Sequence, residues 1–136
     1  MFRNSDNATL IQRQYYNDTA SQYDTMHAHE GDDDQGSVRL PSAVLRMIEP
    51  QTVLDVGAGT GRGILHLLNS LPNASVCGIE PVAALIDQAV KKNGVPKGAI
   101  TQGTGETLPF ADRSFDVVCS FALLHHVPNP NTVFAR

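Results

Sequence analysis

The feature that most restricts the fold of this chain is a short β-branched run that ends in a cluster of glycines. Thr52 to Val56 reads as a buried strand, and Gly57-Ala58-Gly59-Thr60-Gly61 follows it directly. Glycine tolerates positive φ and has no Cβ, so such a turn lets the backbone come very close to a ligand. The amphipathic run that follows, over 61–71, predicts a helix whose free N–H groups point at that ligand. This order of elements favours a parallel α/β sheet with a binding site at the turn.

The alternation of strand and helix patterns continues along the chain. We expect three more short apolar strands at 75–80, 99–102 and 114–120. Helices are expected at 37–48, 81–92 and 129–136. Near-continuous apolar strands that are separated by helices are typical of a mostly parallel sheet with helices on both faces. The expected fold class is therefore α/β, a three-layer sandwich, with about four strands in this chain.

The residues before this alternation are polar, with scattered apolar positions. Leu10, Tyr16 and Tyr23 recur at near-helical steps, so we expect one or two short amphipathic helices up to about residue 24. Residues 27–36 read as a solvated loop, because their run of aspartates lacks the ligand spacing of a calcium loop. Pro41 is expected in the first turn of the helix over 37–48. The expected organisation is a helical segment and loop over 1–36, followed by an α/β domain over 37–136.

Composition excludes several classes of protein. The 136 residues suffice for one domain, and the hydrophobic share of 41% is typical of globular proteins. The net charge of -4 leaves no basic excess, so nucleic acid is not an expected partner. Cys77 and Cys119 stand alone in apolar runs, which favours free thiols in a reducing compartment. With no apolar stretch long enough to span a membrane and no signal sequence, we expect a cytoplasmic protein.

Two kinds of ligand fit a glycine turn of this type, and the register of the glycines separates them. A dinucleotide fingerprint needs G-x-G-x-x-G, but Arg62 occupies the third glycine position counted from Gly57. Asp55 precedes the first glycine by two residues, and its carboxylate would repel a pyrophosphate but favour a ligand with an ammonium group and a sulfonium. Glu80 ends the next strand, where a carboxylate can accept hydrogen bonds from two ribose hydroxyls. Glu80 could also act as an N-cap-like acid for the following helix, and the two roles are compatible.

Further segments, in order along the chain, resemble the class I, Rossmann-like methyltransferases. Val53 to Gly61 is similar to the family's first motif, and Gly78-Ile79-Glu80-Pro81 to its acidic strand end. Gly105-Glu106-Thr107-Leu108-Pro109-Phe110, before the fourth strand, is similar to the segment that packs against adenine. Phe121 to Val127 resembles a stretch common in small-molecule methyltransferases of the ubiquinone-biosynthesis type, and Tyr15 to Asp24 resembles the family's N-terminal lid. The resemblance runs from about residue 14 to about residue 130.

This resemblance implies a Rossmann-like fold that binds S-adenosylmethionine, with S-adenosylhomocysteine as the product. The residues that it places at the cofactor are Tyr15, Tyr23, Asp55, Gly57, Ala58, Gly59, Gly61, Glu80, Pro81, Thr104, Gly105, Glu106 and Phe121. Members often have an acid where this chain has Thr104, whose hydroxyl would accept the adenine hydrogen bond more weakly. His125 and His126 are candidate general bases for the acceptor. The alternative is that one of them is a buried neutral histidine and the other faces solvent. We expect no metal.

The family's sheet has seven strands, whereas this chain is expected to supply four. The strand over 114–120 would then form an apolar sheet edge, which proteins normally avoid. We therefore expect a C-terminally truncated chain; the alternative is a partner chain, such as a second copy, that pairs with this strand. The expected function is O-, C- or N-methylation of a small molecule. Two alternatives are a fragment that binds the cofactor without catalysis and a nicotinamide-dependent oxidoreductase, which the glycine register disfavours.

Overall fold

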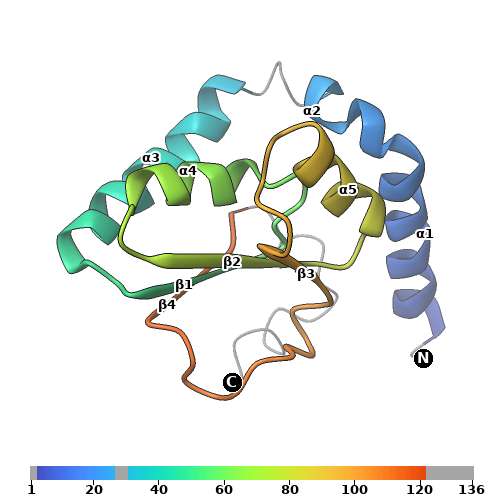
Figure 1. Ribbon diagram of the computed structural model, residues 1–136. Coiled ribbons are helices and arrows are strands. Elements are labelled where there is room, and N and C mark those ends of the chain that lie inside the picture. The colour runs from blue at the N-terminus through green and yellow to red at the C-terminus, as the bar shows by residue number, and fades with distance from the viewer. Residues whose placement is uncertain (1–2, 27–30, 122–136) are drawn as a thin grey trace.

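A four-stranded parallel sheet forms the centre of the computed structural model, which describes residues 3–26 and 31–121 (Figure 1). The strands are β1 (Thr52–Val56), β2 (Ser75–Glu80), β3 (Ile100–Gln102) and β4 (Val117–Cys119). Their order in the sheet is β3-β2-β1-β4, so β1 has β2 on one side and β4 on the other. The strand order reverses at β1, which makes its carboxyl end the place where α/β sheets bind ligands. The α/β prediction is confirmed.

The first two strands have the predicted bounds, whereas β3 and β4 are shorter than predicted. β4 begins at Val117, and the residue before it also contacts β1. The Asp116 carboxylate accepts hydrogen bonds from the N–H groups of Gln51 and Thr52, at 2.9 and 3.0 Å. These bonds hold the chain beside the start of β1 and lower the pKa of Asp116. Among the described residues β4 is a sheet edge, as predicted.

The two faces of the sheet are covered differently. Helices α3 (Gly31–Ile48), α4 (Arg62–Ser70) and α5 (Ala83–Lys91) lie on the same side of the sheet in Figure 1. A buried cluster joins them to it and includes Leu45, Val53 and Ile64. The other face is covered by the segment between β3 and β4, through Leu108, Phe110 and Phe115. Within the described ranges, this second face therefore carries an irregular segment where we predicted helices.

Helix α3 corrects two predictions. It begins at Gly31, so the predicted loop is wrong for 31–36, and 27–30 lie outside the described residues. Pro41 lies inside this helix rather than in its first turn. Aspartate has a low intrinsic helix propensity, so the run of aspartates did not indicate a helix start in the sequence. The division predicted at residues 36 and 37 falls within α3, and the two-part organisation stays a prediction. The helix predicted over 129–136 is not among the described residues.

The N-terminal segment is helical as predicted, but the apolar face expected to be buried is partly exposed. It consists of α1 (Arg3–Thr19), the 3-10 turn η1 (Ala20–Gln22) and α2 (Tyr23–Met26). Figure 1 shows α1 beside the carboxyl ends of the strands. Leu10 and Ile11 are both 63% exposed, whereas Tyr16 and Tyr23 pack against Val82 and Leu85. Leu10 therefore does not share a buried helix face with these tyrosines.

The two cysteines are free thiols, as predicted, and both are partly buried. Burial, together with the nearby charge of Asp55, raises the pKa of the Cys119 thiol to about 12, so this thiol stays protonated at neutral pH. Across residues 3–26 and 31–121, no helix has the length and apolarity that crossing a membrane requires. The cytoplasmic location stays a prediction.

Gly61 is the residue at which the glycine turn passes into α4. It is the N-cap of the helix and has a φ of 77°, in the left-handed region. A Cβ at this position would lie 2.4 Å from Cγ2 of Val95 and 3.2 Å from Cβ of Ala89. The backbone of the turn is thus packed directly onto side chains of the core. Only glycine satisfies both the dihedral angle and the space.

We expect Gly61→Ala to destabilise the fold more than Gly94→Ala. Gly94 has nearly the same φ, 76°, but no atom within 4 Å of an added Cβ. Gly94→Ala therefore measures the cost of the dihedral angle alone, about 1 kcal/mol. Gly61→Ala adds the cost of overpacking, for a total of about 3 kcal/mol. Urea unfolding of both variants checks this, and equal losses would contradict the packing argument.

Candidate functional site

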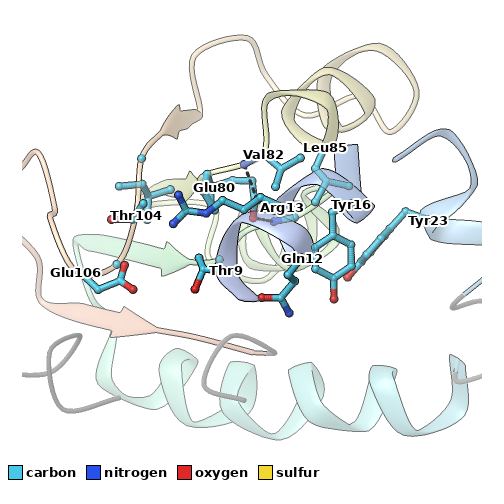
Figure 2. A pocket seen from close by; sticks show the side chains of 16 residues that line it. Thr9, Gln12, Arg13, Tyr16, Tyr23, Glu80, Val82, Leu85, Thr104 and Glu106 are labelled. Carbon is cyan, nitrogen blue, oxygen red and sulfur yellow. Dashed lines mark hydrogen bonds between the residues drawn. The ribbon is translucent and has the colours of Figure 1, made fainter. Parts of the chain in front are cut away.

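A pocket lies at the carboxyl ends of the central strands, beneath α1. Three parts of the chain form its walls: one face of the N-terminal segment, the glycine turn with the end of β2, and the turn after β3. Figure 2 shows how these side chains converge. The lining residues are Thr9, Gln12, Arg13, Tyr16, Tyr23, Gly57, Gly59, Ile79, Glu80, Pro81, Val82, Leu85, Gly103, Thr104, Gly105 and Glu106.

Eight of the thirteen residues predicted to contact a cofactor line this pocket, and they come from distant parts of the chain. They are Tyr23, Gly57, Gly59, Glu80, Pro81, Thr104, Gly105 and Glu106. The fold brings them together because parallel strands present their carboxyl ends at one edge of the sheet.

The other five lie outside the lining. Ala58 and Gly61 pack into the core below the turn, and Phe121 packs against the same core. Tyr15 is 50% exposed, with its ring edge-on to Tyr16. Asp55 is buried beneath the first turn of α4, as described below. The candidate bases His125 and His126 lie outside the described residues and stay predictions.

Glu80 connects the two halves of the pocket floor. Its Oε2 accepts a hydrogen bond of 2.9 Å from the N–H of Gly59, and its Oε1 one of 2.9 Å from the N–H of Val82. Burial raises the pKa of this carboxyl, while the N–H groups of Val82 and Gly59 and the charge of Arg13 act in the opposite direction. The carboxylate thus holds the glycine turn against the start of α5. Each oxygen keeps a lone pair for a further donor.

Asp55 lies deeper than the pocket wall. Only 2% of the residue is exposed, and its Oδ1 has no hydrogen-bond partner among the described residues. Its Oδ2 lies 3.0 Å from where a Cβ on Gly63 would stand, so the side chain points under the first turn of α4. Burial, and to a lesser extent the charge of Glu80, raises the pKa of Asp55 to about 7.

The N-terminal segment was predicted to lie over the cofactor, but sequence reasoning missed the four residues of α1 that line the pocket. Thr9, Gln12, Arg13 and Tyr16 are spaced as one helical face, and all four line the pocket. In Figure 2 the Arg13 side chain extends across the pocket beside Glu80. Their spacing was visible in the sequence, but polar residues on one helix face normally indicate a solvated surface. Here the polar face is turned inward and defines the upper wall of the pocket.

The turn after β3 forms the remaining wall. The hydroxyls of Thr104 and Thr107 lie 3.0 Å apart and share a hydrogen bond. The N–H of Gly103 donates to the main-chain carbonyl of Glu80 at 3.1 Å, which ties this turn to the end of β2. The Thr104 hydroxyl predicted to meet an adenine amino group is therefore already paired with Thr107, although it keeps a free lone pair.

The pocket combines groups that suit one kind of ligand. Glu80 can accept hydrogen bonds from a pair of hydroxyls, and Arg13 places a positive charge beside it. Tyr16 and Tyr23, whose ring centroids lie 5.7 Å apart, offer aromatic surface, and Val82 and Leu85 apolar surface. In the described part of the chain, no group of three or more His, Cys, Asp or Glu side chains could hold a metal ion. The arrangement suits a nucleoside-like ligand whose two ribose hydroxyls are unsubstituted.

Comparison with known proteins gives a family for this arrangement. The family model described as a methyltransferase domain matches residues 53–136. Over 87 residues, the chain is 36% identical to the malonyl-[acyl-carrier protein] O-methyltransferase of Xylella fastidiosa. Over 91 residues, it is 34% identical to the demethylmenaquinone methyltransferase of Deinococcus radiodurans. The two alignments cover 63% and 65% of this chain but only 30% and 38% of those proteins.

The fold also has solved counterparts. The crystal structure of the YcgJ protein from Bacillus subtilis superposes with a TM-score of 0.62 at 28% sequence identity. The match covers 73% of this chain and 43% of that protein. Over the matched residues this chain therefore has the fold of a larger protein, of which the match spans less than half.

We expect Asp55→Asn to remove a pH dependence of stability. The folded-state pKa of about 7 lies above the ordinary value of 3.8. Between these values the folded state binds more protons than the unfolded state, so wild-type stability falls as the pH rises. The variant has no such loss, so its stability relative to wild type should increase by on the order of a few kcal/mol between about pH 4 and about pH 8.

Denaturant unfolding at several pH values measures this difference. Asp112→Asn is the matched control, because Asp112 is exposed. The control should show no comparable pH trend. A stability difference between Asp55→Asn and wild type that stays constant with pH would show that the Asp55 carboxyl does not titrate in this range.

Proposed function

Because the chain belongs to the family of methyltransferase domains, we propose that it binds S-adenosylmethionine in the pocket beneath α1 and serves methyl transfer to a small molecule. One observation carries the proposal. The Glu80 carboxylate stands at the pocket wall between the glycine turn and α5, with a lone pair left on each oxygen. When bound, the cofactor supplies a methyl group on a sulfonium.

The residues present fit this cofactor. Glu80 is placed to accept hydrogen bonds from the two ribose hydroxyls. Gly57 and Gly59 have φ of 81° and 55° and let the amino-acid part of the ligand approach the backbone. The Oδ1 of Asp55, which has no partner in the described part of the chain, is a buried acceptor beneath the same turn, and an ordered water or the ligand's ammonium group would satisfy it. A dinucleotide would bring a pyrophosphate close to the Glu80 carboxylate.

The remaining walls can be assigned by their chemistry. The turn at Thr104, Gly105 and Glu106 offers backbone groups and a short hydroxyl at the adenine end. Tyr16 and Tyr23 offer aromatic faces, which attract a positively charged sulfonium. With the cofactor held on these fixed groups, the protein's main contribution is to position the methyl group and to exclude water.

The small-molecule acceptor rests on the relatives. Their names describe action on a malonyl-[acyl-carrier protein] and on demethylmenaquinone. The first acceptor is a small acyl group carried on a protein and the second is a free small molecule, so we propose a small-molecule acceptor with its atom (O, C or N) unassigned. His125 and His126 remain candidate bases for deprotonating it, and a homo-oligomer through β4 remains a proposal.

Calorimetric titration of the chain with S-adenosylmethionine, S-adenosylhomocysteine and NAD tests the proposal. We expect both adenosyl ligands to bind in a ratio of one per chain and NAD not to bind. Binding of NAD alone would overturn the proposal. Binding of the adenosyl ligands without turnover on any acceptor would support the alternative of a cofactor-binding fragment.

We expect Glu80→Gln to weaken S-adenosylhomocysteine binding by about 10-fold to 100-fold, because hydrogen bonds from the ribose would lose a charged acceptor. Glu49→Gln is the control, since Glu49 is exposed and lies outside the pocket lining. A 2′-deoxy analogue of the ligand separates the loss of a ribose contact from a general distortion of the pocket. In the wild type this analogue should bind more weakly than the parent ligand. In Glu80→Gln the analogue and the parent ligand should bind with similar affinity. Equal sensitivity to the 2′-hydroxyl in both proteins would argue against the ribose role.

A further inference from the structure

Three segments that are far apart in the sequence meet at the carboxylate of Asp24. Its Oδ1 accepts a hydrogen bond of 2.6 Å from the hydroxyl of Thr60, and its Oδ2 one of 2.8 Å from the side-chain amide of Asn93. The same amide of Asn93 also donates to the main-chain carbonyl of Thr60 at 3.0 Å. Asp24 belongs to α2, Thr60 to the glycine turn, and Asn93 follows α5. The N-terminal segment is thus hydrogen-bonded both to the glycine turn and to the residue that follows α5.

Thr60, which bonds Asp24, is a buried residue in the middle of the glycine turn. Only 2% of Thr60 is exposed, and it stands between Gly59, whose N–H binds Glu80, and Gly61, which is packed on the core. The partner of Asp24 is therefore buried between two residues whose positions are fixed by contacts with β2 and the core. Hydrogen bonds to a carboxylate are about twice as strong as those between neutral groups.

Asp24 is directly joined to the aromatic wall of the pocket. Tyr23 precedes it in the chain and lines the pocket, with its ring edge-on to that of Tyr16. Asp24, Thr60 and Asn93 are not among the pocket-lining residues, so any effect of the cluster on a ligand acts through its neighbours. Movement of this wall away from the pocket would strain or break the bonds to Asp24, and it would also remove contacts that hold a ligand beneath α1.

We propose that Asp24 is a positioning residue that latches α1 and α2 over the pocket and thereby sets how fast an adenosyl ligand enters and leaves. The identity of the ligand rests on the proposed function. The latch itself does not depend on the identity of the ligand, because its hydrogen bonds form between residues of the chain. Breaking these bonds should speed ligand release, while the residues that contact the bound ligand stay the same.

The chain contains its own reporter for this test. It has three tyrosines and no tryptophan, and Tyr15, Tyr16 and Tyr23 all belong to the N-terminal segment. Tyrosine fluorescence therefore reports on this segment alone. Collisional quenching by acrylamide measures how far its rings are shielded, and it needs no bound ligand.

The first measurement compares quenching of the ligand-free full chain in matched variants. Thr60→Val keeps the shape of the side chain but removes the donor to Asp24, whereas Thr60→Ser keeps the donor. Asp24→Asn places an amide where a carboxylate accepts two bonds, and it provides a second variant should Thr60→Val fail to fold. Asp18→Asn is the control, because Asp18 is an exposed acid of the same segment, bonded to Gln14. We expect more quenching in Thr60→Val and Asp24→Asn only.

The second measurement is the rate of S-adenosylhomocysteine release, followed by stopped-flow tyrosine fluorescence. We expect release about tenfold faster in Thr60→Val and Asp24→Asn, and near the wild-type rate in Thr60→Ser and Asp18→Asn. Thermal unfolding of each variant separates this effect from a general loss of stability. Variants with wild-type unfolding temperatures and faster release would support the positioning role.

Two results would overturn the proposal: unchanged quenching in both Thr60→Val and Asp24→Asn, or increased quenching with an unchanged release rate. If the wild-type chain bound no adenosyl ligand, the proposed function would fall. The quenching comparison would still decide whether Asp24 latches the segment, so the two failures are distinguishable.

Discussion

The bridge that Glu80 makes between two backbone N–H groups underlies most of the site. Three of the five residues of the glycine turn have no side chain, so much of its geometry depends on what its backbone N–H groups bind. Gly59 donates to Glu80, and Gly57 and Ala58 both donate to the carbonyl of Ile79. The turn is therefore held against the end of β2 by bonds to two adjacent residues. Because Glu80 also binds Val82, the start of α5 is fixed by the same carboxylate.

This dependence explains why so much of the pocket floor could be predicted from the sequence. β1, the glycines and the acid after β2 are local signals: each is readable within a few residues, and the parallel sheet brings them to one edge. Glu80 was predicted to bind a ribose and, compatibly, to act as an N-cap-like acid for the next helix. It bonds the N–H of Val82, the residue before α5, and so fixes the start of that helix without capping its first turn, and its remaining lone pairs leave room for a ribose.

The upper wall could not be predicted in the same way. Hydrophobic periodicity assumes that a helix turns its apolar residues inward, and α1 does the opposite: Leu10 and Ile11 are exposed, whereas Gln12 and Arg13 face the pocket. This orientation is set by tertiary contacts with η1 and α5, which a local pattern does not contain. Similarly, Tyr15 and Tyr16 are neighbours in the sequence, and only the three-dimensional packing shows that Tyr16 lines the pocket.

The fastening of Asp24 to Asn93 also has a consequence for how the chain reaches its folded state. The two residues are separated by 69 positions, and the segment between them contains β1, α4, β2 and α5. Contacts over such distances form late, because ordering the intervening loop costs entropy before the contact contributes. The N-terminal helices are synthesised before the strands, yet their docking site exists only after Asn93 has been synthesised and the strands have paired. We therefore expect these helices to dock after the later-made elements have assembled.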